Sequence, residues 1–158
     1  MALNMRRAKE VDIDAVPAEE CTQFIVGLPP HAPDDASVLH RFYDSWVEAH
    51  YFFTGDWQDN SLPGGFILGG EDWHSWHPQH EPTKVLNTDA VKDIARHLSG
   101  LSPDIRSARL DRMTSGTAGL PKLSHPDDIP FIAPTFDEVI AFVQTAANRN
   151  EAIVKDIG

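Results

Sequence analysis

Apolar residues recur every three or four positions in several parts of the chain, as in helices that bury one face. The longest such stretch covers about residues 35–53, and Thr54-Gly55 follows it as a natural helix end. A shorter helix is predicted after Pro17, and its apolar face ends at Leu28 before Pro29. Further apolar stripes predict helices that begin near residues 88, 103 and 135.

Capping residues support three of these helix starts. Asn87 or Thr88 can cap the helix that Gly100 ends, and Ser102-Pro103 combines an N-cap residue with proline in the first turn. The next helix is expected to turn Ile105 inward. Residues 135–138 read Thr-Phe-Asp-Glu, which is a capping box at the start of a last helix over 135–148.

Strand signals are weaker. Leu3–Ala8 is predicted as an edge strand, and Gly65-Phe66-Ile67-Leu68-Gly69 as a short buried strand. Ala152–Ile157 fits a strand or a helix, and residues 113–134 are predicted as a long proline-rich loop. The elements do not alternate as β-α-β units. Residues 1–158 are therefore predicted to form one compact α+β domain of four or five helices with a few short strands.

Composition narrows the function classes. The 158 residues carry 24 acidic and 13 basic side chains, a net charge of −11, which argues against sequence-independent binding of nucleic acid. No apolar run is long enough for a membrane helix, so no membrane association is expected. The N-terminus has no apolar segment typical of a secretion signal, and Cys21 is the only cysteine. A cytoplasmic protein without disulfides is therefore expected.

The acids are unevenly distributed. Between Arg41 and Lys84 there is no lysine or arginine, while the same window holds seven acidic residues. Several of these acids adjoin tryptophans, and tryptophan is enriched where partner proteins bind. We expect a surface that binds a basic protein, with a solvated acidic face as the alternative. The residues assigned to this surface are Asp56, Trp57, Asp59, Glu71, Asp72, Trp73 and Trp76.

Three histidines follow at spacings of three: His74, His77 and His80. Imidazole is a good ligand for zinc, copper or nickel, and the nearby Glu71 or Asp72 could complete a site for a divalent metal. Pro78 interrupts any helix here, and the run matches no established metal motif. A small metal-dependent enzyme, or a sensor of a metal or small molecule, is therefore the alternative function. No catalytic residue is assigned.

Two other groups have ordinary structural readings. His50 is expected to face inward as a core histidine. Arg106, Arg109 and Arg112 lie three apart, and a solvated helix face is expected there, with an anion site as the alternative.

The segment Trp46-Val47-Glu48-Ala49-His50-Tyr51-Phe52-Phe53-Thr54-Gly55 resembles the YfbM-like family of bacterial domains of unknown function. Members show a Trp and then a Leu-His-Tyr-Leu-Leu-Thr-Gly run that closes a helix. A later apolar segment ends in Gly-Gly, as Gly69-Gly70 does here. The likeness covers the chain from about Trp46 onward and, more loosely, the N-terminus.

The resemblance implies a compact α+β domain. It implies no catalytic mechanism, cofactor or active-site residues. The residues that carry it are Trp46, His50, Tyr51, Thr54, Gly55, Gly69 and Gly70. Small acidic bacterial domains of this kind are also similar to cytoplasmic immunity proteins, the antidotes of secreted toxins.

Overall fold

The protein is built on a five-stranded antiparallel sheet in the order β2-β1-β5-β4-β3. The structure, a computed structural model, describes residues 2–41, 45–74, 83–121 and 125–158. The strands are β1 (Leu3–Ala8), β2 (Val38–Arg41), β3 (Glu71–Asp72), β4 (Lys84–Leu86) and β5 (Ala152–Ile157). Together with the helices they confirm the α+β class.

The two terminal strands form the middle of the sheet. β1 lies between β2 and β5, so the prediction of an edge strand is wrong for Leu3–Ala8. β5, undecided between strand and helix, pairs with β1 along its length and with β4 on its other side. The pairing of β1 with β5 also joins the chain ends, because the Gly158 amide donates to the Ala2 carbonyl at 3.1 Å.

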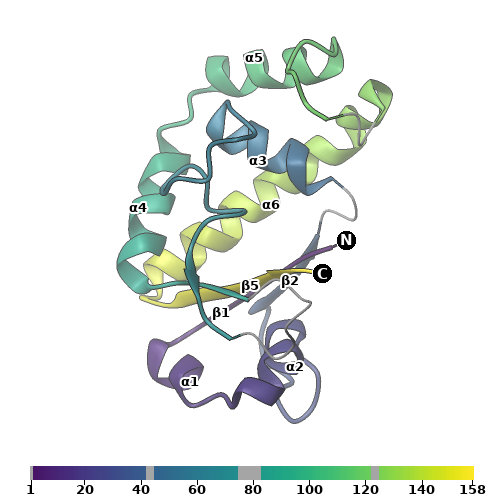
Figure 1. Ribbon diagram of the computed structural model, residues 1–158. Coiled ribbons are helices and arrows are strands. Elements are labelled where there is room, and N and C mark those ends of the chain that lie inside the picture. Colours follow the sequence, from purple (N-terminus) through teal and green to yellow (C-terminus); the bar gives the residue numbers. More distant parts are fainter. Residues whose placement is uncertain (1, 42–44, 75–82, 122–124) are drawn as a thin grey trace.

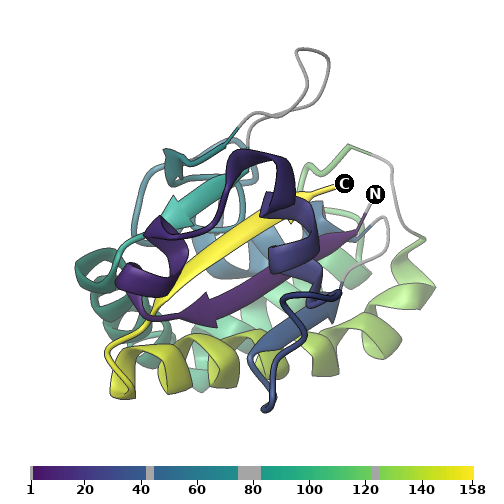
Figure 2. The same cartoon turned by 90° about the horizontal axis from the view of Figure 1, so that it is seen from below.

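Helices cover both faces of the sheet (Figure 1). On one face lie α1 (Glu10–Asp14) and α2 (Cys21–Val26), with the short 3-10 turn η1 (Ala18–Glu20) between them. Figure 2, seen from that side, shows them lying across β1 and β5. On the other face lie α3 (Trp46–Thr54), α4 (Thr88–Ser99) and α6 (Ile129–Asn148), with α5 (Pro103–Thr114) beyond α3.

Each face of the sheet has its own apolar core. The larger one joins Met5 and Ile153 to the side chains of α3, α4 and α6. The smaller one joins Val154 to Ile13 of α1 and Phe24 of α2. Because successive residues of a strand face opposite sides, β5 sends Ile153 and Lys155 toward the larger core and Val154 toward the smaller. No helix among the described residues could cross a membrane.

The helix predicted over 35–53 is wrong in its first half. Val38–Arg41 is strand β2, paired with Leu3–Arg6, and α3 begins only at Trp46. Leu39 fits the helical spacing but is buried from the strand. Over a segment as short as Val38–Arg41, the spacing of apolar residues does not distinguish a helix from a strand. Pairing with β1 makes this segment a strand.

The segment 65–69 is also not a strand. Residues 62–68 form consecutive turns, although Phe66 and Ile67 are fully buried. The two glycines allow this burial because their backbones lie against another part of the same loop. A Cβ atom on Gly65 would come within 2.5 Å of the Asn60 carbonyl carbon, and one on Gly69 within 2.5 Å of the Asn60 oxygen.

The loop predicted over 113–134 is shorter than expected, and residues 122–124 lie outside the described part. α5 continues to Thr114, the 3-10 turn η2 (Pro126–Asp128) follows, and α6 already begins at Ile129. Pro130 falls in the first turn of α6, where proline is tolerated. The capping box is therefore wrong: Thr135 lies within α6, and its hydroxyl donates to the Ile132 carbonyl at 2.5 Å.

The other helix starts agree with the structure. Asn87 caps α4 by accepting from the Ala90 amide, and Ser102 caps α5 by accepting from the Ile105 amide. Ile105 is 42% exposed, however, so its predicted inward orientation is wrong. The outer position of α5, beyond α3, leaves this side chain without a layer to bury it.

Candidate functional site

Helix α3 is buried on nearly all sides, and it carries three buried polar side chains: Glu48 in its first turn, and His50 and Tyr51 in its middle. Four side-chain atoms of these residues are buried and have no hydrogen-bond partner among the described residues. They are Glu48 Oε2, both ring nitrogens of His50 and the Tyr51 hydroxyl. Buried polar groups are normally paired, so a concentration of unpaired ones on a single helix needs an explanation.

His50 confirms the expectation of an inward-facing histidine and is fully buried. Desolvation is the main cause that lowers its pKa, and the charge of Lys155 adds to this effect. The backbone and carboxylate of Asp59 oppose it, but neither ring nitrogen reaches a described partner with hydrogen-bond geometry. The ring is therefore held neutral.

Lys155 lies in the larger core beneath the turns of residues 62–68. Its side chain is buried, and its ammonium donates to the Ile67 carbonyl at 2.8 Å. Burial, assisted by the charge of Lys84, lowers the pKa of Lys155 to about 7. This lysine ties the turns of residues 62–68 to the sheet, a role that the sequence pattern does not indicate. Its only signal was a charged residue within an apolar terminal strand.

The end of α3 is fixed by polar contacts to its last carbonyls. Arg109 of α5 donates to the Phe52 carbonyl at 2.6 Å, and His97 of α4 contacts the Phe53 carbonyl at 3.0 Å. Gly55, with φ of 80°, ends the helix in the left-handed conformation as predicted. Arg109 therefore supports α3, whereas Arg106 pairs with Asp137 of α6, so these arginines do not form one anion site.

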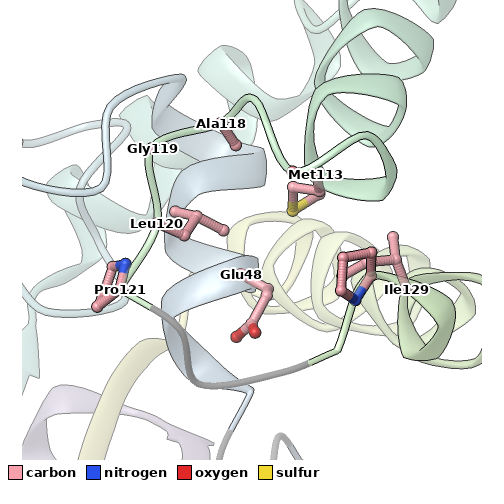
Figure 3. A pocket seen from close by; sticks show the side chains of 9 residues that line it. Glu48, Met113, Ala118, Gly119, Leu120, Pro121 and Ile129 are labelled. Carbon is pink, nitrogen blue, oxygen red and sulfur yellow. The ribbon is translucent and has the colours of Figure 1, made fainter.

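A cavity of about 320 Å³ lies at the other end of α3. It is bounded by the end of α5, the loop after α5 and the beginning of α6. Its apolar walls include Met113, Leu120 and Ile129. Glu48 reaches into it from α3, pointing into the space between Leu120 and Ile129 (Figure 3). In the sequence, Glu48 stands out only as one of the seven acids between Arg41 and Lys84.

Other acidic residues between Arg41 and Lys84 lie at the surface, unlike the buried Glu48. We define the acidic segment as residues 56–72. Its four carboxylates, at Asp56, Asp59, Glu71 and Asp72, are exposed. Asp72 pairs with Lys84, whereas the other three form no ion pair with a described residue. Two hydrogen bonds from Ser61 lower the pKa of Asp59, so this carboxylate stays charged at neutral pH.

The tryptophans of this surface are half-buried. Trp57 packs against the larger core, and Trp73 packs against the smaller core with its ring 6.1 Å from Phe24. Each indole therefore has a structural role and offers only part of its ring to a partner. Trp76 lies outside the described residues.

The histidine run can be followed only at its first member. The His74 ring is tilted against the Trp73 ring at 4.5 Å between centroids, while its backbone pairs with Thr83. His77 and His80 lie outside the described residues. Within the described part, no group of three or more His, Cys, Asp or Glu side chains is placed to hold a metal ion. The proposed divalent metal site stays a prediction.

The residues that carry the family resemblance lie on α3 and in the segment that follows it. Trp46, His50 and Tyr51 lie on the helix, and the Thr54 hydroxyl donates to the His50 carbonyl at 2.8 Å. Gly70, with φ of 124°, leads into β3 against the backbone of Val85. The motif thus shapes the helix and its following loop.

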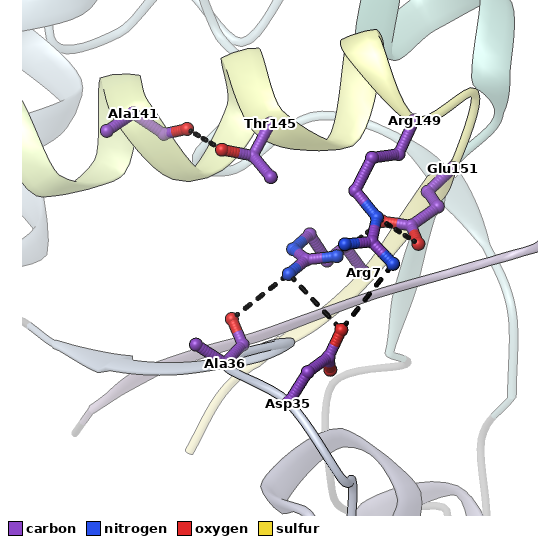
Figure 4. A network of polar contacts seen from close by, with 7 residues as sticks. All are labelled: Arg7, Asp35, Ala36, Ala141, Thr145, Arg149 and Glu151. Carbon is purple, nitrogen blue, oxygen red and sulfur yellow. Dashed lines mark hydrogen bonds and ion pairs between the residues drawn. The ribbon is translucent and has the colours of Figure 1, made fainter.

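A second buried carboxylate, that of Glu151, is paired with arginines, unlike that of Glu48. Glu151, between α6 and β5, accepts from Arg7 Nη1 at 2.7 Å and from Arg149 Nε at 3.1 Å (Figure 4). Arg7 also lies 3.6 Å from Asp35. This network joins β1, β5 and the segment before β2, and it leaves no acid without a cation.

No curated protein and no solved structure was found to match the chain. One family model matches residues 33–155, which include the helices α3, α4, α5 and α6, the strands β2, β3 and β4, and the first four residues of β5. The match is consistent with the YfbM-like resemblance of the region around α3. Because it spans most of the sequence, the chain belongs to the family described as "Domain of unknown function (DUF1877)".

Proposed function

We propose that the protein is a cytoplasmic binding module that docks on a basic protein through the acidic segment. The single observation that carries this proposal is the charge of the segment's surface. Asp56, Asp59 and Glu71 are exposed without a described cation beside them, in a window that contains no lysine or arginine. Uncompensated acids at a surface attract a basic partner and speed its association.

The construction of the loop also favours a docking surface. Lys155 holds the Ile67 carbonyl, and the backbone at Gly65 and Gly69 packs against Asn60. The carboxylates are therefore presented by an anchored loop, which reduces the ordering cost of binding. The exposed part of Trp57 lies next to Asp56 in sequence and supplies an apolar contact. An immunity protein against a basic toxin is one member of this class.

The test compares two variants with equal charge. In the first, Asp56→Asn, Asp59→Asn and Glu71→Gln are combined. In the second, three exposed acids elsewhere without described ion pairs are changed: Asp14→Asn, Glu19→Gln and Asp111→Asn. Each variant loses three negative charges. Asparagine at positions 56 and 59 keeps the side-chain oxygen that accepts from the backbone amides of Gln58 and Ser61.

Tagged wild type and both variants are used to capture partners from lysate at low salt. We expect a basic protein to bind wild type and the control variant, and to associate at least about tenfold more slowly with the first variant. That difference should shrink as salt is raised. Equal association with both variants would show that the acidic segment is only a solvated face.

A further inference from the structure

We infer that the cavity beside Glu48 binds a small organic cation, an alkylammonium or alkylguanidinium group. This inference goes beyond the proposed function, because the cavity lies at the N-terminal part of α3 and uses none of the carboxylates of the acidic segment. Its ligand is recognised by one buried carboxylate within apolar walls.

Glu48 supplies a buried carboxylate without a described partner. Glu48 is 2% exposed, and its Oε2 atom has no hydrogen-bond partner among the described residues. None of the described lysine, arginine or histidine side chains forms an ion pair with it. The first turn of α3 places it at the favourable end of the helix dipole, but the dipole supplies no hydrogen-bond donor to Oε2. An unpaired buried charge is costly, and a bound cation would remove that cost.

The cavity has the size and the apolar lining that suit a small organic ligand. A volume of about 320 Å³ is at the lower end of the range for small-molecule sites, so a ligand of a few heavy atoms fits. Met113, Leu120 and Ile129 provide apolar contacts for an aliphatic chain. A metal ion is a poor match because Glu48 is the only acidic or histidine side chain that lines the described cavity.

One buried carboxylate in an apolar cavity therefore suits an organic cation with a charged group at the end of a short aliphatic chain. The ammonium or guanidinium would donate to Glu48, and the stem would lie along the apolar walls. Two sources offer this chemistry: a free amine of low molecular mass, or a lysine or arginine side chain of another protein.

The experiment titrates n-butylammonium into the full chain and follows amide shifts of Met113, Gly116, Gly119 and Leu120 by NMR. 1-Butanol, which has the same stem without the charge, is the neutral comparison. We expect n-butylammonium to shift these amides and to bind at least about tenfold more tightly than 1-butanol. In Glu48→Gln the preference should disappear, because the amide retains the size of the side chain without its charge.

A second variant guards against a folding effect of Glu48→Gln. Ala118→Leu keeps Glu48 and places extra carbons at the wall of the cavity, so it should weaken n-butylammonium binding at least about tenfold. Equal binding of the two probes by wild type, or unchanged amine binding by Glu48→Gln, would overturn the inference. So would the absence of any shift with n-butylammonium.

Lys122 follows Pro121 in the sequence and lies outside the described residues, so Lys122→Met is the matched control. We expect this variant to bind n-butylammonium within about twofold of wild type. Binding by Lys122→Met but not by wild type would overturn the inference, because the natural occupant would then be the chain's own lysine.

The two sources are separated by a third probe, a short peptide with an acetylated N-terminus, an amidated C-terminus and a single lysine as its only charged residue. If the peptide binds as well as the free amine, the natural ligand is a side chain of a partner protein. If only the free amine binds, it is a small molecule. The triple variant Asp56→Asn, Asp59→Asn, Glu71→Gln should retain n-butylammonium binding, which keeps this test separate from that of the acidic segment.

Discussion

Two buried glutamates of this protein meet opposite conditions. Glu151 lies between α6 and β5 and is held by Arg7 and Arg149, whereas Glu48 lies on α3 and faces an apolar cavity without a described partner. Burial is similar, at 8% and 2% exposed. The partners differ, and they decide the role: the paired carboxylate joins elements of the fold, and the unpaired one is available for a ligand.

Lys155 is an intermediate case, because its buried ammonium donates to one backbone carbonyl and forms no ion pair with a described carboxylate. Of the expected effects on the free energy of unfolding, the one caused by Lys155 is the largest. The folded-state pKa is about 7, below the ordinary value of 10.5, so between these values the unfolded chain binds more protons than the folded one. The free energy of unfolding should therefore rise by about 3.5 kcal/mol from pH 7 to pH 10.

Urea unfolding of wild type and Lys155→Met at pH 7, 8.5 and 10 measures this effect. The rise that belongs to Lys155 is the difference between the two proteins, since the other titrating groups are common to both. If the free energies of unfolding of wild type and Lys155→Met change with pH in parallel, the ammonium keeps its ordinary pKa. Lys155 would then not be an intermediate case between Glu151 and Glu48.

The next effect tests the paired glutamate. Glu151→Gln leaves Arg7 buried with only the more distant Asp35 and a backbone carbonyl, so the free energy of unfolding should fall by about 3 kcal/mol. Urea unfolding at pH 7 gives the value. A loss below about 1 kcal/mol would show that the ion pair contributes little, and the comparison of the two glutamates would fail on this side.

The unpaired glutamate should respond in the opposite direction. Glu48→Met replaces a buried carboxylate by an apolar side chain of similar length among apolar walls, and we expect the free energy of unfolding to rise by about 1 kcal/mol. Thermal and urea unfolding without added amines measure it. A clear destabilisation would indicate that Glu48 supports the fold, in the way Glu151 does.

The smallest effect separates the two arginines of the network. Arg149 is half-exposed and contacts Glu151 at 3.1 Å, so Arg149→Gln should lower the free energy of unfolding by only about 0.5 kcal/mol. Measured beside Glu151→Gln, it shows whether Arg7 alone accounts for the pairing. An effect as large as that of Glu151→Gln would assign the main role to Arg149.

Local patterns predicted the parts of the fold that depend on local chemistry. Asn87, Ser102 and Gly55 act at the helix ends where the sequence placed them, because capping is an interaction within one turn. Val38–Arg41 and the segment 65–69 were misread, because pairing with β1 and packing against Asn60 involve distant parts of the chain. Thr135 was misread because α6 begins upstream of it, at Ile129, with a proline tolerated in its first turn.

The candidate site divides in the same way. The sequence indicated the uncompensated acids and the inward-facing His50, since both follow from local charge and apolar spacing. It gave no sign that Glu48 would face a cavity, because that cavity is formed by α3, the loop after α5 and the start of α6.

The sequence by itself determined the α+β class, most helix ends and the excess of negative charge over residues 42–83, all of which follow from composition and from neighbours within a few positions. Only the tertiary structure decided which charges are paired. Glu151 meets Arg7 across 144 positions, and Glu48 meets apolar side chains from two other helices. Partners at such separations are set by packing of the whole chain, so the role of a buried charge becomes visible only after folding.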